Sequence, residues 1–447
     1  MANNGGKALA DINRLLEAAK KAGAQQAEVY QVSNEEMPVR FEANRLKELN
    51  SRHTSGVALR VIAGGRIGFA SSTRPGDVED VIQAALETAP FGPEAHFDFP
   101  AQTEAPVVEV YDPATDAISV DEMVGLGQSL IDMTIAAEPD ILCDVSVRRS
   151  AGEVTLANTA GAHFTYRATM FSAWLHGTLI RGTDMLFVGD GDASCSPQID
   201  TKAIQASVAG QLANARRHAT SRTAELPVIF TSIGVAEALM GPITMAFSGR
   251  LVHQGQSPLA GLLGEEKYDR RISLSDDATL PMRPASRPCD DEGVASRVIP
   301  LIDRGVVRSF MYDLQTAGLA KAQSTGSAGR SLTSQPAISP SSLVFAEGDI
   351  SFEDMVKGVK EGIIVEELMG AGQGNVMGGD FSGNVLLGYK IENGEIVGRV
   401  KDTIVAGNVH DALGRVLAIG DRGRWVGGTV FAPPILFERL AVSAKGS

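Results

Sequence analysis

The stretch VALRVIAGGRIGFA, residues 57–70, predicts a β-hairpin and sets the character of the first half of the chain. Two short apolar runs, residues 57–62 and 67–70, flank Ala63-Gly64-Gly65-Arg66, and a glycine pair between such runs is typical of a tight turn. A strand-like run, residues 27–32, precedes the hairpin. Residues 76–89 follow it with the apolar spacing of a helix. The pattern predicts a segment that mixes helices and strands.

The same rules predict further elements. Helical spacing covers residues 7–21, 204–218 and 233–246, and short strands with Gly and Asn turns are expected over 142–187. Ser119 and Glu122 form a capping box at a helix start, and Ser351 with Asp354 caps another. Hairpins are predicted at residues 302–306 and at 391–396, where Asn393-Gly394 suits a type I′ turn. We therefore expect an α+β fold, with a mixed α/β N-terminal domain (residues 1–222) and a β-rich, barrel- or sandwich-like C-terminal domain (residues 223–447).

The composition excludes several classes of function. The chain has 447 residues, 44% of them hydrophobic, so intrinsic disorder is not expected. Its 40 Lys and Arg against 54 Asp and Glu give a net charge of −14, which disfavours direct binding to nucleic acid because that affinity depends on basic side chains. No run approaches the roughly 20 apolar residues of a membrane span. The three cysteines form no C-x-x-C motif, and we expect a cytoplasmic protein.

Sequence motifs of common catalytic sites are missing. No pair among the seven histidines has helical metal-ligand spacing, and no G-x-S-x-G sequence marks a serine nucleophile. The glycine-rich run at residues 370–374 lacks both the dinucleotide spacing and the Lys-Ser/Thr of a phosphate loop. These patterns alone indicate an α+β protein without an assigned reaction.

A series of short stretches along nearly the whole chain resembles the signatures of the TldD/PmbA family. The stretches are residues 57–71, 158–161, 247–250, 288–294, 324–329, 379–382, 391–396 and 404–408. In that family, TldD-like subunits bind zinc through an H-E-x-x-x-H helix and a later cysteine, and they hydrolyse peptides. TldE/PmbA-like subunits lack these ligands and pair with the first type, and the two enclose a peptide-binding chamber. The family also carries the label of DNA gyrase modulator.

The resemblance implies the subtype without the zinc motif. Glu237 aligns with the family glutamate, but Ala236 and Gly241 stand at the histidine positions, and no cysteine follows Cys289. A zinc site needs three or four N, S or O ligands. We therefore expect no metal and no cofactor in this chain, and no catalytic residue. Glu237 therefore stands at a degenerate position of the motif, and we expect it to lie on the helix surface or to line the cavity that admits peptide.

The resemblance also implies partners. We expect a TldD-like zinc protease subunit or a second copy of this chain, together with an unfolded peptide or a leader peptide. The candidate peptide-binding residues lie within the glycine-rich stretch 370–383, which either turns strands or lets a peptide pair along a strand edge. They are Gly378, Gly379, Asp380, Phe381 and Ser382. Two alternatives stay open: a homodimer that binds peptides without cleaving them, and a metallopeptidase with a rearranged site, for instance His253 with Glu265 or Glu266.

Overall fold

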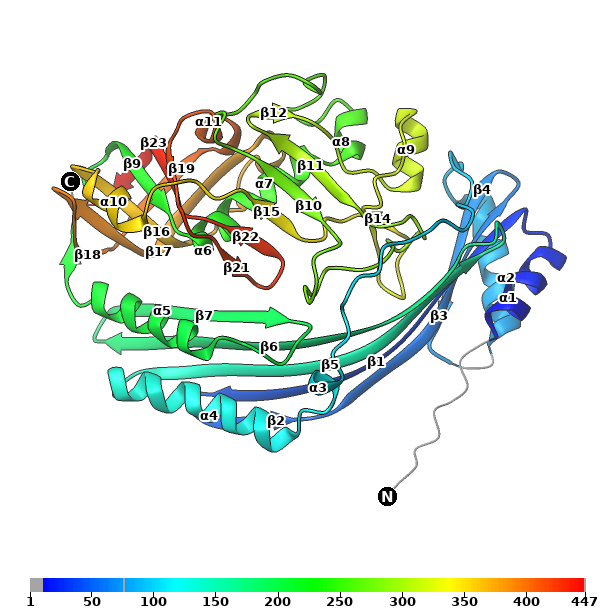
Figure 1. The fold of residues 1–447 in the computed structure, drawn as a ribbon, viewed down its shortest axis with the longest axis horizontal. Coiled ribbons are helices and arrows are strands. Elements are labelled where there is room, and N and C mark those ends of the chain that lie inside the picture. The colour runs from blue at the N-terminus through cyan, green and yellow to red at the C-terminus, as the bar shows by residue number, and fades with distance from the viewer. Residues whose placement is uncertain (1–10, 75–76, 446–447) are drawn as a thin grey trace.

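The computed structural model describes residues 11–74 and 77–445 and has an α+β fold (Figure 1). A long curved sheet runs along one side of the molecule, and the C-terminal half of the chain packs over it. Strands in this sheet follow the order β4-β3-β1-β5-β6-β7, and β2 pairs with β1. The elements of the first half are α1 (Ile12–Lys21), β1 (Gln26–Glu42), β2 (Arg45–Leu49), β3 (Arg52–Ala63), β4 (Arg66–Ser72), α2 (Val78–Thr88), η1 (Ala89–Phe91), α3 (Pro113–Asp116), α4 (Val120–Ala137), β5 (Leu142–Asn158), β6 (His163–Arg181), β7 (Asp184–Ser194) and α5 (Thr201–Asn214).

The predicted N-terminal hairpin is confirmed. Strands β3 and β4 pair antiparallel, and Ala63 lies opposite Arg66. Gly64 and Gly65 have φ angles of 58° and 73°, the left-handed pair that a type I′ turn requires. Apolar residues of α1, α2, β1 and β3 form a core at this end of the sheet. The starts of the two helices predicted over residues 7–21 and 76–89 fall on residues 7–10 and 76, outside the described residues.

The capping box is also confirmed. The backbone N–H of Glu122 donates to Ser119 Oγ at 3.2 Å, and the backbone N–H of Ser119 donates to Glu122 Oε2 at 2.8 Å. These two bonds satisfy N–H groups at the start of α4 that have no partner within the helix. Helix α4 then packs its buried face on the sheet, where Gly127 lies against the ring of Phe41.

The prediction of short strands over residues 142–187 is wrong. Strands β5 and β6 contain 17 and 19 residues, and β7 contains 11. Polar residues do not interrupt β5, because Arg148 and Arg149 form ion pairs across the sheet with Glu36 and Glu35 of β1. The predicted helix over 204–218 is displaced toward the C-terminus, since α5 begins at Thr201 and ends at Asn214, and His218 enters a strand.

The second half contains a closed barrel and a six-stranded sheet. Its elements are β8 (His218–Ala219), β9 (Ala224–Phe230), α6 (Ser232–Gly234), η2 (Val235–Leu239), α7 (Met240–Ala246), α8 (Gly249–His253), β10 (Leu274–Asp277), β11 (Val298–Asp303), β12 (Val306–Val307), α9 (Leu314–Ala320), β13 (Ala328–Gly329), β14 (Ala337–Ile338), β15 (Leu343–Phe345), α10 (Phe352–Lys357), β16 (Glu361–Met369), η3 (Val376–Gly378), β17 (Asp380–Glu392), β18 (Glu395–Val400), β19 (Thr403–Asn408), α11 (Val409–Leu413), β20 (Val416–Ile419), β21 (Arg424–Val426), β22 (Val430–Ala432) and β23 (Ile435–Ala444).

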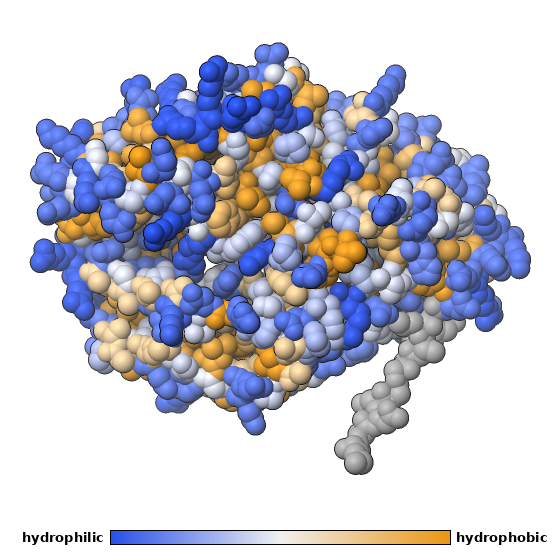
Figure 2. Space-filling model, viewed as in Figure 1, coloured by the Kyte–Doolittle hydropathy of each residue, from blue (hydrophilic) through white to orange (hydrophobic). Residues whose placement is uncertain are grey.

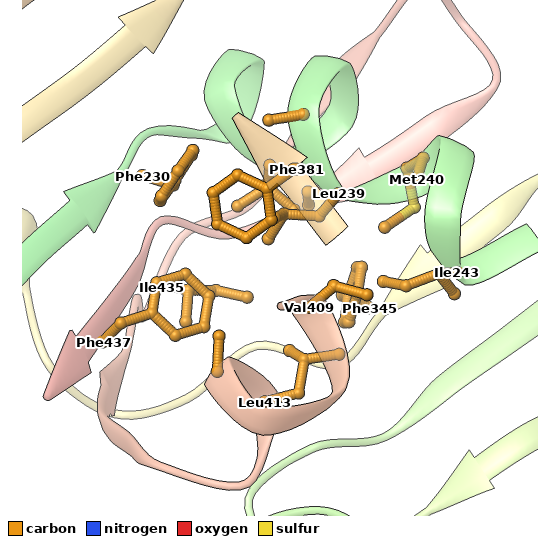
Figure 3. Packing of buried hydrophobic residues seen from close by; sticks show 14 of the residues in the cluster. Phe230, Leu239, Met240, Ile243, Phe345, Phe381, Val409, Leu413, Ile435 and Phe437 are labelled. Atoms are coloured by element: carbon orange, nitrogen blue, oxygen red, sulfur yellow. The ribbon is translucent and has the colours of Figure 1, made fainter. Parts of the chain in front are cut away.

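The barrel closes because β16 pairs with β17 as well as with β9, which completes the ring β16-β9-β23-β19-β17. Phe230 packs edge-to-face against Phe381 and Phe437, with ring centroids 5.9 and 5.7 Å apart (Figure 3). The predicted Asn393-Gly394 turn is confirmed, with φ angles of 50° and 80° between β17 and β18. The domain boundary between residues 222 and 223 stays a prediction.

Among the described residues, no helix combines the length and the apolar character that crossing a membrane requires.

Candidate functional site

The helix that carries Glu237 has an irregular centre. After Thr231, residues 232–234 form one α-helical turn, Val235–Leu239 form a π-helical turn, and the α-helix resumes at Met240. Leu239 and Met240 lie in the core of the second half (Figure 3). Such π-turns are rare and occur frequently at functional sites. The predicted helix is therefore present, but its hydrogen bonding changes at the residues that the family resemblance singles out.

Glu237 lies on the exposed side of this helix and has an altered acidity. Partial burial raises its pKa to about 7, and the nearby carboxylate of Glu367 contributes. Burial also raises the pKa of Glu367, and the charge of His176 on β6 opposes that rise. Glu367 lies where the β16–β17 register is irregular. The irregular helix and β16 thus bring together two carboxyl groups with raised pKa values, and the first sheet contributes His176 beside them.

Charged side chains behind Glu237 connect the two halves of the molecule. Both guanidinium NH₂ groups of Arg424 on β21 donate to the buried carboxylate of Asp190 on β7, one of them at 2.7 Å. Thr231 donates to Glu366 Oε2 at 2.9 Å, immediately before the irregular helix. The first contact joins β21 to β7 of the first sheet, and the second joins the start of the irregular helix to β16.

The residues present do not fit a zinc site. Ala236 and Gly241 provide no ligating atom, and Glu237 is the single ligand-type side chain at the aligned positions. Within residues 11–74 and 77–445, no group of three or more His, Cys, Asp or Glu side chains is arranged to hold a metal ion. His253 is exposed on α8, and no such group joins it to Glu265 or Glu266.

The predicted peptide-binding residues lie beside the irregular helix, since η3 packs against α7. Gly379 has a φ of 95°, and Gly378 accepts a hydrogen bond from Asn408 Nδ2 at 2.8 Å. From Asp380 to Ser382 the backbone pairs with β19, and Phe381 is buried in the barrel core. These contacts favour a structural role for Phe381, and peptide binding by this segment stays a prediction.

One histidine is buried beside the predicted peptide-binding residues. His410 in α11 is 3% exposed, and its Nδ1 lies 2.9 Å from the hydroxyl oxygen of Tyr268. Burial lowers the pKa of His410 to about 4, so the ring is neutral. A Cβ atom at Gly379 would lie 2.4 Å from His410 Cδ2. The glycine is required here by both its backbone conformation and the close approach of the ring.

Two of the cavities between the first sheet and the second half are lined by strand β14. The larger, about 610 Å³, is lined by β3, β4, α8, α9 and β14, and we call it the α8–α9 cavity. The second, about 520 Å³, is lined by β5, β6, β13 and β14. Ala337 and Ile338 of β14 line both cavities. Figure 2 shows the face of the molecule seen in Figure 1, with hydrophilic side chains over most of its periphery and more apolar ones toward its middle.

A buried ionic cluster at the α8–α9 cavity is not predicted by the sequence analysis. Arg60 donates to Glu292 Oε1 at 2.6 Å and to Glu28 Oε2 at 3.0 Å, and Arg330 donates to Glu28 Oε1 at 2.8 Å. None of these side chains is more than 3% exposed. The sequence feature that could have indicated this cluster is Arg60, a charged residue at the centre of an apolar strand. Two of the family-like stretches supply members of the cluster, since residues 57–71 contain Arg60 and residues 288–294 contain Glu292.

Comparison with known proteins agrees with this geometry. Residues 223–444 match the model of the PmbA/TldA metallopeptidase C-terminal domain, and residues 27–89 match PmbA/TldA metallopeptidase domain 1. The chain is 25% identical to the metalloprotease PmbA homologue of Haemophilus influenzae, over 92% of this chain and 90% of that protein. It is 23% identical to an uncharacterized protein of Methanocaldococcus jannaschii, over 96% of this chain and 99% of that one.

A solved structure shares the fold. The crystal structure of TldE from Thermococcus kodakarensis matches with a TM-score of 0.87 at 24% identity, over 97% of this chain and 100% of that one. Together the two domain models cover well over half of the chain. The chain therefore belongs to the PmbA/TldD metallopeptidase family.

Proposed function

We propose that this chain is the TldE/PmbA-like, metal-free subunit of a TldD/PmbA-type metalloprotease. It pairs with a TldD-like subunit that carries zinc, and it forms one wall of a chamber for unfolded peptides or leader peptides. The observation that carries the proposal is the irregular helix, where Ala236 and Gly241 leave Glu237 without companion ligands. We place the complex in the cytoplasm, in keeping with three buried free cysteines.

The residues of this chain support a role in holding substrate. A glutamate activates water for peptide hydrolysis most effectively when a metal ion lowers the pKa of that water. Ala236 and Gly241 provide no ligating atoms to hold such an ion beside Glu237, so we assign bond cleavage to the partner. Glu237, whose pKa is raised to about 7, instead contributes an exposed carboxyl group near that of Glu367.

The two cavities support a peptide as the ligand. Strand β14 pairs with β13 in a two-stranded sheet, and within the described residues it has no second strand partner. Extended peptides bind such edges through main-chain hydrogen bonds, and their side chains alternate between the two faces. Ala337 and Ile338 stand between the two cavities. A peptide along β14 therefore has one cavity for the side chains on each of its faces.

Co-expression with a homologue that carries the H-E-x-x-x-H helix tests the proposal. Native mass measurement and metal analysis are expected to show a mixed complex with zinc in the partner alone. Glu237→Gln is expected to leave peptide hydrolysis by that complex within a few-fold of the original. The matched control is the same substitution at the glutamate of the partner's motif, which should abolish hydrolysis.

Two results would contradict the proposal. A loss of about 10³-fold or more with Glu237→Gln, the size expected for removal of a key catalytic group, would make this chain catalytic. A stable self-dimer that binds peptides and does not join the homologue would support the alternative of a homodimeric peptide-binding protein.

A further inference from the structure

The floor of the α8–α9 cavity carries more negative than positive charge. Glu292 lines it and is surrounded by the carboxylates of Glu28, Asp290 and Asp313, whereas Arg60 is the cation that contacts it. Burial raises the pKa of Glu292 to about 7, and the neighbouring carboxylates contribute while Arg60 opposes them. Arg330 is bound to Glu28, and the charge of Arg287 acts on Asp290, so three arginines face these four carboxylates. A buried surplus of negative charge is unfavourable unless a cation accompanies it.

Asp313 supplies an oxygen that the protein leaves unused. Its side chain caps α9, and Oδ1 accepts hydrogen bonds from the backbone N–H and the hydroxyl of Thr316, both at 2.7 Å. Oδ2 has no hydrogen-bond partner among the described residues, although Asp313 is 6% exposed and lines the cavity. Oδ2 is not one of the fully enclosed polar atoms that lack a partner, so it is open to the cavity and is a candidate acceptor for a ligand.

We infer that the α8–α9 cavity binds a primary ammonium group, with Oδ2 of Asp313 as its main acceptor. A guanidinium prefers two carboxylate oxygens at once, and Asp313 has a single one free, so a compact ammonium fits better. Apolar and amide side chains line much of the rest of the cavity, as suits a short peptide, and they include Ile67, Leu251, Leu319, Gln254 and Gln335. The ammonium is then a peptide N-terminus or a lysine side chain, an identification that rests on the proposed function.

Arg250 and His253 of α8 line the same cavity and are exposed. A cation at Asp313 lies at the buried end, and the exposed end carries basic groups suited to main-chain carbonyls or a carboxylate. The cavity therefore orients a peptide, with its ammonium inward and the rest of the chain toward the exposed side.

Calorimetric titration of the full chain with four probes tests the inference. The probes are n-butylammonium, alanyl-leucyl-alanine amide, its N-acetylated form, and an N-acetylated tripeptide amide with lysine at the centre. We expect binding of n-butylammonium and of the peptide with a free N-terminus, and weaker binding of the acetylated peptide by at least about tenfold. Binding restored by lysine in the acetylated peptide identifies the side chain as a second source of the ammonium.

The variant Asp313→Asn removes the charge and keeps a side chain that caps helices equally well. It is expected to weaken binding of n-butylammonium by about 10- to 100-fold, the range for a hydrogen bond to a charged group. Asp200→Asn is the matched control, since Asp200 caps α5 through the N–H of Ala203 and does not line the cavity. Equal loss in both variants, or no loss in either, would overturn the inference.

The pH dependence provides an independent readout. An alkylammonium stays protonated between pH 6 and 8, whereas Glu292 ionises in this range, so affinity should rise with pH by up to about tenfold. Histidines also titrate there, and the measurement is therefore repeated with His253→Gln. An affinity that is constant or falls with pH in both proteins would contradict the assignment.

The two proposals fail in different ways. Equal affinity for acetylated and free peptides, with no binding of n-butylammonium, refutes the ammonium site and leaves the peptide chamber standing. Binding of n-butylammonium that depends on Asp313, without binding of any peptide, supports the ammonium site and removes the peptide as its carrier.

Discussion

Replacing Arg60 with methionine tests how strongly the buried ionic cluster joins the first sheet to the second half. Arg60 is 3% exposed at its side chain, contacts Glu28 and Glu292, and lies 5.0 Å from the ring centroids of Phe97 and Phe99. In Arg60→Met, Glu28 keeps its bond to Arg330, but Glu292 keeps only the N–H of Leu314. Removing one partner of a buried ion pair destabilises a protein by about 3–5 kcal/mol, and we expect this loss at pH 8.

The loss of stability caused by Arg60→Met should be larger at high pH than at low pH. The pKa of Glu292 is raised to about 7, so the native state holds a proton that the unfolded state has released, and stability falls as pH rises toward 7. Arg60 lowers this pKa, so its removal extends the fall above pH 7, by at most about 1.4 kcal/mol per pH unit. At pH 5.5 Glu292 is protonated in both proteins, and the difference between them is expected to be smaller.

Urea denaturation at pH 5.5 and pH 8 measures both effects. Far-UV circular dichroism reports the unfolding of the whole chain. Of the two tryptophans, Trp174 in β6 belongs to the first half and Trp425 in β21 to the second, and their fluorescence reports unfolding around each. Arg52→Met is the control, because Arg52 lies on the same strand with an exposed side chain and a 3.3 Å pair to Glu48; we expect at most about 1 kcal/mol there. A destabilisation by Arg60→Met below 1 kcal/mol, or equal at both pH values, would refute the reasoning.

Two further pairs of substitutions each compare a crowded or buried position with an exposed one. Gly68→Ala would place a Cβ 1.9 Å from the carbonyl oxygen of Ala85, so we expect the free energy of unfolding, measured by denaturation, to fall by more than about 2 kcal/mol. Gly125 is exposed in α4, and a Cβ there would have nothing within 4 Å, so Gly125→Ala should raise the free energy of unfolding by about 0.5–1 kcal/mol. Phe381→Ala should destabilise the protein by about 3–5 kcal/mol, whereas Ser382→Ala should destabilise it by less than about 0.5 kcal/mol. If Phe381→Ala left the stability unchanged, that result would contradict the placement of Phe381 in the barrel core.

Local rules predict the turns and caps of this protein well. The Gly64-Gly65 and Asn393-Gly394 hairpins and the Ser119 capping box form as expected, because each depends on residues within a few positions of one another. The same rules give wrong strand lengths over residues 142–187. There, partners on β1 more than 100 positions earlier in the chain, such as Glu36 for Arg148, keep polar residues within long strands.

The candidate site divides in the same way. The proposed subtype rests on residues 236, 237 and 241 compared with the family pattern, and the sequence alone shows that the side chains of Ala236 and Gly241 lack ligating atoms. The π-turn around Glu237 and its proximity to Glu367 depend on how the helix packs against β16, and no local pattern indicates them.

The amino-acid sequence by itself determined the family, the α+β character, the turns and the loss of ligating side chains, since these depend on residue identity and short-range spacing. The tertiary structure alone decided that Arg60 meets Glu292, 232 positions away, and that Asp313 faces a cavity with one oxygen free. The physical reason is burial. A charged side chain inside a protein is stable only beside partners that the fold brings together from distant segments.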